Sequence, residues 1–323
     1  MTPSETMYNW KDRQTGTERV RGEGRDLVMR IAEAPVSWLK PDPTNKRLYS
    51  KSKEKYNGEP LTSDECFEEL WKLSSVKELY NGIMLAGGLT EALYVTENGI
   101  TKEGNERLTA LNAIRQGLEA DIFMEEEKER LIQLLDKIPV KVLPDDITDK
   151  EMSLMLADWH LGGKDPWPAM NQAEHIYDMN HKQGIPVSEI SYRLRKSRTW
   201  IHQRIKAYTW AREHFERGDR WKETKEFSYF EELYKQKKKL AEGGFDVEEN
   251  SDNLYEFMDW VATKQIPRAL DVRKLAKVLE FDTTRELLMQ GNGKQAFLDL
   301  KFHDASETSP RFAAIKRMNN QLD

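Results

Sequence analysis

The residues best suited to chemistry lie where a predicted strand meets a predicted helix. Residues 92–95 and 99–101 are strand-like, and Gly104 follows as a turn before an amphipathic helix. Glycine lets the backbone approach a ligand closely, and the first N–H groups of a helix have no intrahelical partner. Arg107 adds a planar set of donors that suits phosphate oxygens. This spacing predicts an anion site. The alternative is an ordinary strand–turn–helix with a surface arginine.

Carboxylates and a histidine around this motif are candidates for acid–base or metal chemistry. A metal nuclease needs converging carboxylates around a hard cation, and a phosphotransferase needs a carboxylate base. Glu103, Glu106 and His160 are therefore the catalytic candidates, and Asp158 is a candidate metal ligand. Solvated surface acids are the alternative. The remaining histidines considered show no ligand-like spacing and are expected at the surface or the edge of a core: His175, His181 and His214.

Composition limits the class of protein. The chain has 323 residues, of which 33% are charged, and a net charge of −6. No apolar run approaches the roughly 20 residues that span a bilayer, and the polar N-terminus does not resemble a secretion signal. Cys66 is the single cysteine, which excludes an internal disulfide. We therefore expect a cytoplasmic protein.

The charge is unevenly distributed along the chain. Between residues 181 and 206 there are seven basic residues (Lys182, Arg193, Arg195, Lys196, Arg198, Arg204 and Lys206) and one acidic residue, Glu189. Salt screens charges beyond about 10 Å, so local charge matters more than the total for binding phosphates. The acidic total does not exclude a DNA-binding protein.

This basic segment has the pattern of a helix-turn-helix. Ser188 is expected to cap a first helix and Ser197 a second, which turns Ile201, Ile205 and Tyr208 inward. Two short helices with a basic, polar outer face on the second suit the major groove of DNA. A helical hairpin with a solvated basic face is the alternative. The predicted DNA-binding residues are Arg195, Lys196, Ser197, Arg198, Thr199, His202, Gln203 and Lys206.

Four parts are expected along the chain. Residues 1–30 are expected to form a flexible arm, residues 31–149 an α+β domain, residues 150–218 a helical domain with the helix-turn-helix, and residues 219–323 a helical C-terminal domain. Strands are expected at 36–39, 92–95 and 138–143, and helices at 63–73, 76–82 and 125–136. No heptad pattern persists, so a dimer would form through globular helical contacts.

The order of four motifs resembles that of the ParB-like (ParB/sulfiredoxin-fold) family, from about residue 36 to residue 210. Leu39-x-Pro41-x-x-x-Asn45-x-Arg47 is similar to its early Asn-Pro-Arg segment, and residues 88–95 are similar to its glycine-led strand. Gly104-x-x-Arg107-x-x-Ala110 is similar to its phosphate motif, and residues 171–173 open the helix before the DNA-binding pair.

The resemblance implies a ParB/sulfiredoxin-like α+β domain, followed by an all-α helix-turn-helix and a helical C-terminal domain. It also implies a phage or plasmid type of protein, often a homodimer, that binds DNA and CTP or ATP with Mg²⁺. The implied phosphate-binding residues are Gly88, Thr90, Gly104, Asn105, Arg107 and Lys164.

Two positions depart from the family pattern. Glu106 stands where the family has an arginine, and near residues 160–164 only Lys164 remains as a phosphate cation. The leading expectation is a ParB-like DNA-binding protein regulated by a nucleotide or other phosphate ligand. A metal-dependent nuclease, a nucleotide-dependent phosphotransferase or nucleotide hydrolase (NTPase), and a structural adaptor are the alternatives.

Overall fold

The chain consists of two compact units. A computed structural model describes residues 8–22, 24–161 and 167–308. Contacts between Cα atoms divide the chain into residues 1–195 and 196–323, whereas the sequence suggested boundaries after residues 30, 149 and 218. The first unit contains a six-stranded sheet and the second is helical, so the expected succession of a sheet-containing part and a helical remainder is confirmed. No helix in the described ranges is long and apolar enough to cross a lipid bilayer.

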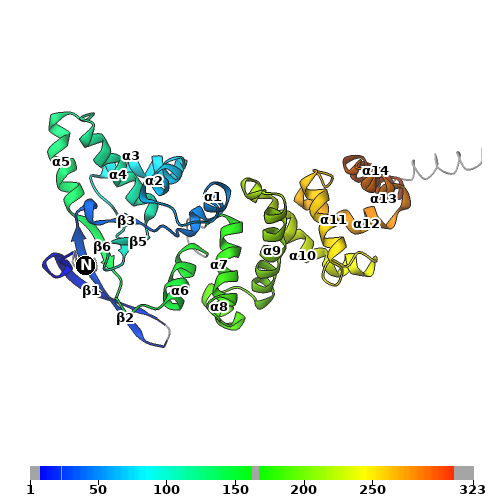
Figure 1. Ribbon diagram of the computed structural model, residues 1–323, viewed down its shortest axis with the longest axis horizontal. Coiled ribbons are helices and arrows are strands. Elements are labelled where there is room, and N and C mark those ends of the chain that lie inside the picture. Colours follow the sequence, from blue (N-terminus) through cyan, green and yellow to red (C-terminus); the bar gives the residue numbers. More distant parts are fainter. Residues whose placement is uncertain (1–7, 23, 162–166, 309–323) are drawn as a thin grey trace, which may run out of the picture. The chain divides into compact units, whose positions relative to one another are not determined.

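The sheet mixes parallel and antiparallel pairs in the order β1-β2-β6-β4-β5-β3 (Figure 1). The pairs β1–β2, β2–β6 and β4–β5 are antiparallel, and β4–β6 and β3–β5 are parallel. The strands are β1 (Gln14–Arg21), β2 (Asp26–Ala34), β3 (Lys40–Pro41), β4 (Leu93–Val95), β5 (Ile100–Glu103) and β6 (Ile138–Val142).

The prediction of a flexible arm over residues 1–30 is wrong for most of the residues that the structure describes there. A 3-10 turn, η1 (Trp10–Arg13), leads into the β1–β2 hairpin. Leu27 and Met29 are buried and alternate with the half-exposed Val28, which is the pattern of a strand with one covered face. Charged residues flank the apolar part of β2, so the alternation of buried and exposed side chains is too short to be recognised in the sequence. The strand expected at 36–39 is instead a 3-10 turn, η2 (Val36–Trp38), followed by β3.

One face of the sheet carries the main core. Leu93 and Val95 of β4 pack in one apolar cluster with Leu108, Leu111 and Ile114 of the helix after Gly104, as expected. The helices whose side chains join this cluster are α2 (Ser63–Trp71), α3 (Ser74–Ala86), α4 (Asn105–Glu119) and α5 (Glu125–Asp136). Thr62 caps α2, and α3 continues beyond the expected end at residue 82 to Ala86, with Gly87 as its C-cap.

The opposite face of the sheet is covered by a second, smaller cluster. Leu27 and Met29 pack with Met155 of α6 (Asp149–His160), and Tyr94 and Trp159 pack against them. Because side chains alternate along a strand, Tyr94 lies on the face opposite its neighbours Leu93 and Val95. Lys141 is the register partner of Tyr94, so both side chains belong to the face that α6 covers.

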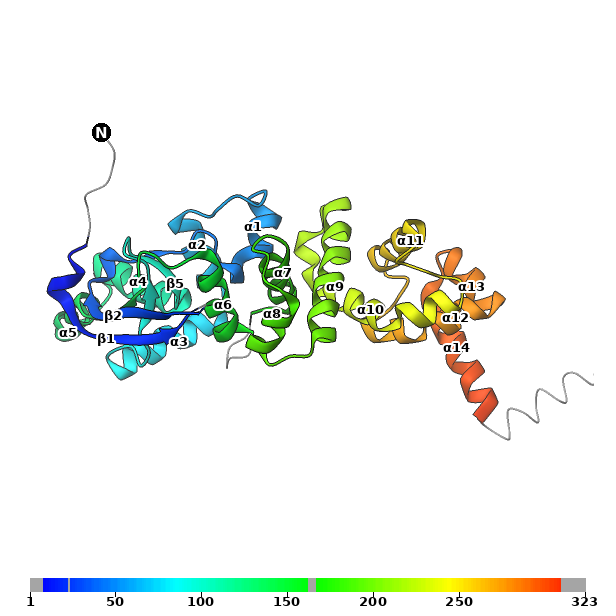
Figure 2. The ribbon, with the colours of Figure 1, turned by 90° about the horizontal axis from the view of Figure 1, so that it is seen from below.

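Helices complete the first unit (Figure 2). Helix α7 contacts α1, η3, α6 and α8, and it thereby joins the segment after β3 to the end of the unit. Pro186, rather than Ser188, precedes α8. The bounds are η3 (Lys46–Leu48), α1 (Tyr49–Lys55), α7 (Ala169–His181) and α8 (Val187–Leu194).

The second unit is a group of helices with an aromatic core. Phe227, Phe230 and Phe257 are almost completely buried, which confirms the helical core predicted for this region. Its elements are α9 (Arg198–Arg217), η4 (Trp221–Glu226), α10 (Phe227–Glu242), α11 (Ser251–Ala262), η5 (Ala269–Lys274), α12 (Leu275–Glu280), α13 (Asp282–Met289) and α14 (Gly293–Thr308).

Candidate functional site

A cavity of about 1040 Å³ lies in the first unit, on the face of the sheet that carries Tyr94 and Lys141. Its wall is built from the segment after β3, the β4 and β5 strands, the start of α4, and helices α6 and α7. Gly104 and Arg107 belong to the wall. The motif predicted to bind an anion therefore borders a cavity large enough for a small organic ligand.

Gly104 fixes the geometry at the start of α4. Its φ of 95° is in the left-handed region, which an L side chain rarely adopts, and a Cβ there would collide with Leu93 Cδ2. Gly104 thus turns the chain from β5 into α4 while leaving room for the Arg107 guanidinium. The first turn of α4 points its N–H groups out of the helix end, so a partial positive charge accompanies this cation.

Two carboxylates hold Arg107 in place. Its Nη1 donates to Glu91 Oε2 at 3.0 Å and its Nη2 donates to Glu103 Oε1 at 2.9 Å. The Arg107 side chain is only 12% exposed, whereas that of Glu91 is 78% exposed. One partner of the guanidinium is therefore enclosed by the protein and the other lies in solvent.

Glu103 also joins Arg107 to His160. His160 Nε2 lies 3.0 Å from Glu103 Oε2, and the His160 ring stacks on Trp167 with centroids 4.4 Å apart. Burial raises the pKa of Glu103, but the hydrogen bond from His160 and the charge of Arg107 outweigh it and keep that pKa below its usual value. Two of the three predicted catalytic residues, Glu103 and His160, are thus in direct contact.

The third, Glu106, has a different partner. Arg47 Nε lies 2.7 Å from Glu106 Oε1, and the Ser75 hydroxyl donates to Glu106 Oε2 at 2.9 Å. Glu106 therefore neutralises a cation from the segment after β3, and this pairing explains how a carboxylate can occupy the first turn of α4 beside a cation-lined cavity.

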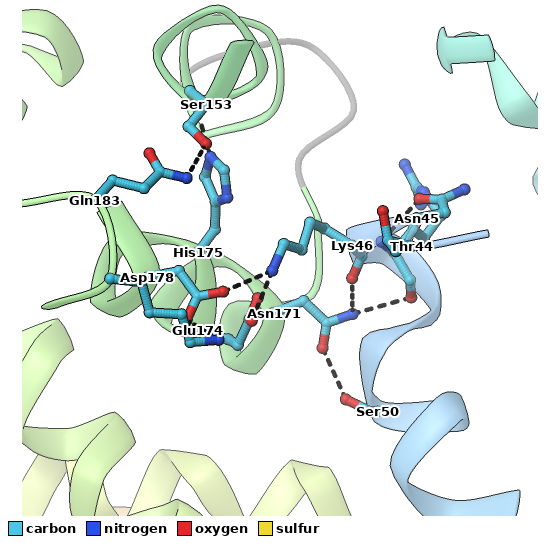
Figure 3. A network of polar contacts seen from close by, with 12 residues as sticks. Thr44, Asn45, Lys46, Ser50, Ser153, Asn171, Glu174, His175, Asp178 and Gln183 are labelled. Atoms are coloured by element: carbon cyan, nitrogen blue, oxygen red, sulfur yellow. Dashed lines mark hydrogen bonds and ion pairs between the residues drawn. The ribbon is translucent and has the colours of Figure 1, made fainter. Parts of the chain in front are cut away.

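Figure 3 shows a polar network between this segment and α7. Lys46 Nζ donates to Glu174 Oε1 at 2.7 Å and to Asp178 Oδ2 at 2.8 Å. Asn171 Nδ2 donates to the carbonyl oxygens of Lys46 and Arg47 at 2.8 and 2.9 Å. These contacts attach the segment after β3, which carries the cavity cations Lys46 and Arg47, to α7.

The network contains two carboxyl groups whose pKa values shift in opposite directions. Burial raises the pKa of Glu174, whose side chain is 2% exposed, above its usual value. Burial acts in the same direction on Asp178, but the hydrogen bond from Glu174 and the charge of Lys46 prevail and lower its pKa. The raised pKa of Glu174 favours its neutral carboxyl form, and Lys46 pairs with the Asp178 carboxylate.

His175 and Gln183 form the inner part of the cavity wall. His175 Nε2 lies 3.0 Å from the Ser153 carbonyl oxygen, to which it must donate, so Nδ1 is an acceptor in the neutral ring. Burial lowers the pKa of His175 to about 4, so the ring is neutral near pH 7. His175 Nδ1 has no hydrogen-bond partner among the described residues.

The prediction that His175 and His214 lie at the surface or the edge of a core is wrong, because they are only 1% and 3% exposed.

The predicted phosphate-binding residues divide into three groups. Thr90, Gly104, Asn105 and Arg107 line the cavity, and Gly88 is not among the lining residues. Asn105 accepts the Asp42 N–H at 2.9 Å and donates to the Thr101 carbonyl oxygen at 2.8 Å, so its side chain holds the wall together. Lys164 lies outside the described residues.

Asp158, the candidate metal ligand, is exposed on α6 and is not among the residues that line the cavity. Burial nevertheless raises its pKa, against the charges of Arg193 and Arg195. Within residues 8–22, 24–161 and 167–308, no three His, Cys, Asp or Glu side chains gather as a metal ion would need.

The predicted DNA-binding residues lie at the end of the first unit and the start of the second. Ser197 caps α9 by accepting the Trp200 N–H at 3.1 Å, as expected. Ile201, Ile205 and Tyr208 are buried, also as expected. The exposed members of the predicted set are Arg195, Lys196, Ser197, Arg198, Thr199 and His202.

Some of the basic side chains of α9 are already engaged. Arg204 forms an ion pair with Glu231 of α10, and Lys206 Nζ lies 3.9 Å from Glu248 Oε1. Gln203 Nε2 donates to the Glu231 carbonyl oxygen at 3.5 Å. Arg198, in the first turn of α9, is exposed and takes part in none of these contacts.

No protein-family model matches the chain, and no curated protein matches it either.

Proposed function

We propose that this chain is a ParB-like DNA-binding protein whose cavity holds a phosphate-bearing ligand. One observation carries the proposal. Asn45 and Arg47, Thr90, and Gly104 with Arg107 come from three separate motifs, and all of them line the same cavity. Residues scattered over three motifs are expected to converge in this way if the motifs form one binding site.

The first turn of α9 supports DNA binding. Arg198, Thr199 and His202 are exposed, and Arg198 forms no ion pair within the described residues. A guanidinium group binds a phosphate or the edge of a guanine through two parallel hydrogen bonds. The N-terminal residues of a recognition helix are the ones that reach base edges in helix-turn-helix proteins.

Fluorescence anisotropy with a labelled DNA duplex, titrated over a range of salt concentrations, tests this part. We expect Arg198→Ala combined with His202→Ala to weaken binding and to lower the slope of log K against log salt by about 0.9 for each lost phosphate contact. Lys222→Ala is the matched control, because Lys222 is also exposed in the second unit but lies outside α9. Unchanged affinity and slope in the double variant would exclude this surface.

An enzymatic role is the second candidate, and the contact between Glu103 and His160 favours it. A carboxylate that holds one imidazole nitrogen at 3.0 Å fixes the ring for proton transfer at the edge of the cavity. The reaction class would be phosphoryl transfer or hydrolysis, with His160 exchanging the proton. Incubation with plasmid DNA and with nucleotides, with Mg²⁺ or Mn²⁺, tests it. Turnover that is lost in His160→Gln but kept in His181→Gln would establish the enzyme, and no turnover in the wild type would exclude it.

A further inference from the structure

The charged groups of the cavity wall balance one another. Each lysine or arginine that lines the cavity has a carboxylate partner. The pairs are Lys46 with Glu174 and Asp178, Arg47 with Glu106, Lys102 with Asp42, Arg107 with Glu91 and Glu103, and Lys141 with Glu18. A wall with many cations therefore offers a ligand little uncompensated positive charge.

These pairs differ in how easily a ligand can take the place of the carboxylate. The partners of Lys46, Arg47 and Lys102 have side chains that are at most 11% exposed, so removing them from their cations would leave buried charges unpaired. Glu91 is 78% exposed and Glu18 is 37% exposed. The Glu91 side chain can rotate into the solvent at little cost in free energy. Arg107 is therefore the cation that is most readily released for a ligand.

The cavity wall also contains a buried histidine whose hydrogen bonding is incomplete among the described residues. His175 lines the cavity, is 1% exposed, and has an acceptor nitrogen, Nδ1, without a partner among the described residues. A buried acceptor without a donor costs stability.

We infer that the cavity takes a phosphomonoester, such as a nucleoside monophosphate, whose single phosphoryl group replaces Glu91 on Arg107 at the start of α4. This inference rests on the proposed phosphate site. A monophosphate brings about two negative charges, one of which is offset when Glu91 leaves. A triphosphate brings about four, and of the remaining cations of the described wall three, Lys46, Arg47 and Lys102, are committed to enclosed carboxylates, which leaves only Lys141, paired with the partly exposed Glu18, to answer the extra charge.

Isothermal titration calorimetry of the full chain with AMP, ADP, ATP, CMP, CDP and CTP tests the inference. The titrations are run with and without Mg²⁺. We expect the monophosphate of the preferred base to bind at least as tightly as its triphosphate. A triphosphate that binds tenfold more tightly, in either condition, overturns the inference while leaving the phosphate site in place. Absence of binding by all six overturns the phosphate site itself.

The role of Glu91 has its own test. Glu91→Gln removes the competing charge from Arg107, and we expect about two- to fivefold tighter binding of the monophosphate. Glu126→Gln is the matched control, because Glu126 is an exposed glutamate outside the cavity wall and loses the same charge. Arg107→Ala should abolish binding. Weaker or unchanged binding in Glu91→Gln overturns the exchange of Glu91 for the phosphoryl group.

Discussion

Replacing Lys46 by methionine should show what holds the cavity wall in place. The substitution keeps most of the aliphatic stem and removes the ammonium that Glu174 and Asp178 share. Removing one partner of a buried ion pair costs about 3–5 kcal/mol. The exposed Lys182 also contacts Asp178, at 2.7 Å, and keeps part of the compensation. We therefore expect a loss near the lower end, about 3 kcal/mol.

Amide hydrogen exchange is the suitable assay, because the chain has two units and a global unfolding signal would combine them. A loss of about 3 kcal/mol corresponds to roughly 150-fold faster exchange of the protected α7 amides. Adding Asp178→Asn to Lys46→Met removes the stranded charge and should restore most of the protection.

Lys51→Met is the matched control for this experiment. It makes the same substitution in α1, where Lys51 is 44% exposed and pairs with Glu54 on the surface, so exchange in α7 should change less than fivefold. If Lys46→Met changes α7 protection no more than Lys51→Met does, or if the double variant is as unstable as Lys46→Met alone, the buried ion pair does not fasten the wall.

Two further substitutions test local parts of the first unit. Because Glu174 has a raised pKa in the folded state, the unfolded chain loses this proton first as pH rises above 4.5, and stability falls until Glu174 also ionises. Glu174→Gln should therefore gain stability relative to the wild type between pH 5 and pH 8 in thermal melts, and a parallel pH dependence of the two proteins would refute the raised pKa of Glu174. Gly104→Ala should cost about 2–4 kcal/mol through the left-handed φ and the collision with Leu93, whereas Gly82→Ala in the exposed interior of α3 should stabilise by about 0.5–1 kcal/mol. Equal melting temperatures for these two variants would contradict the role given to Gly104.

The sequence predicted elements whose signals are local. The turn at Gly104, helix α5 with its bounds at residues 125 and 136, and the strand from residue 138 all lie where their patterns indicated. Glycine, capping residues and apolar periodicity act over a few positions, so a single sequence contains them. The β1–β2 hairpin was missed because β2 is also stabilised by pairing with β6, more than a hundred residues away.

The polar side of the cavity could not be predicted for a related reason. His175 and Glu174 gave no signal in the sequence, since their burial depends on where α7 packs, and Lys46 was not recognised as a buried cation. Glu106 had suggested an anion misplaced at a phosphate site, but its partner Arg47 comes from a segment almost 60 positions earlier. Charge balance within a cavity is a property of the assembled wall, and it emerges only when the fold is known.

The fastening of Lys46 to α7 also has a consequence for the order in which the protein is made. Lys46 and Glu174 are separated by 128 positions. A ribosome adds roughly 5–20 residues each second, so the early strands and α4 wait several seconds for α7 to emerge. Closing so long a loop carries an entropic cost that only the completed contacts repay. The sheet can therefore form before the cavity wall is complete, because α7 supplies part of that wall.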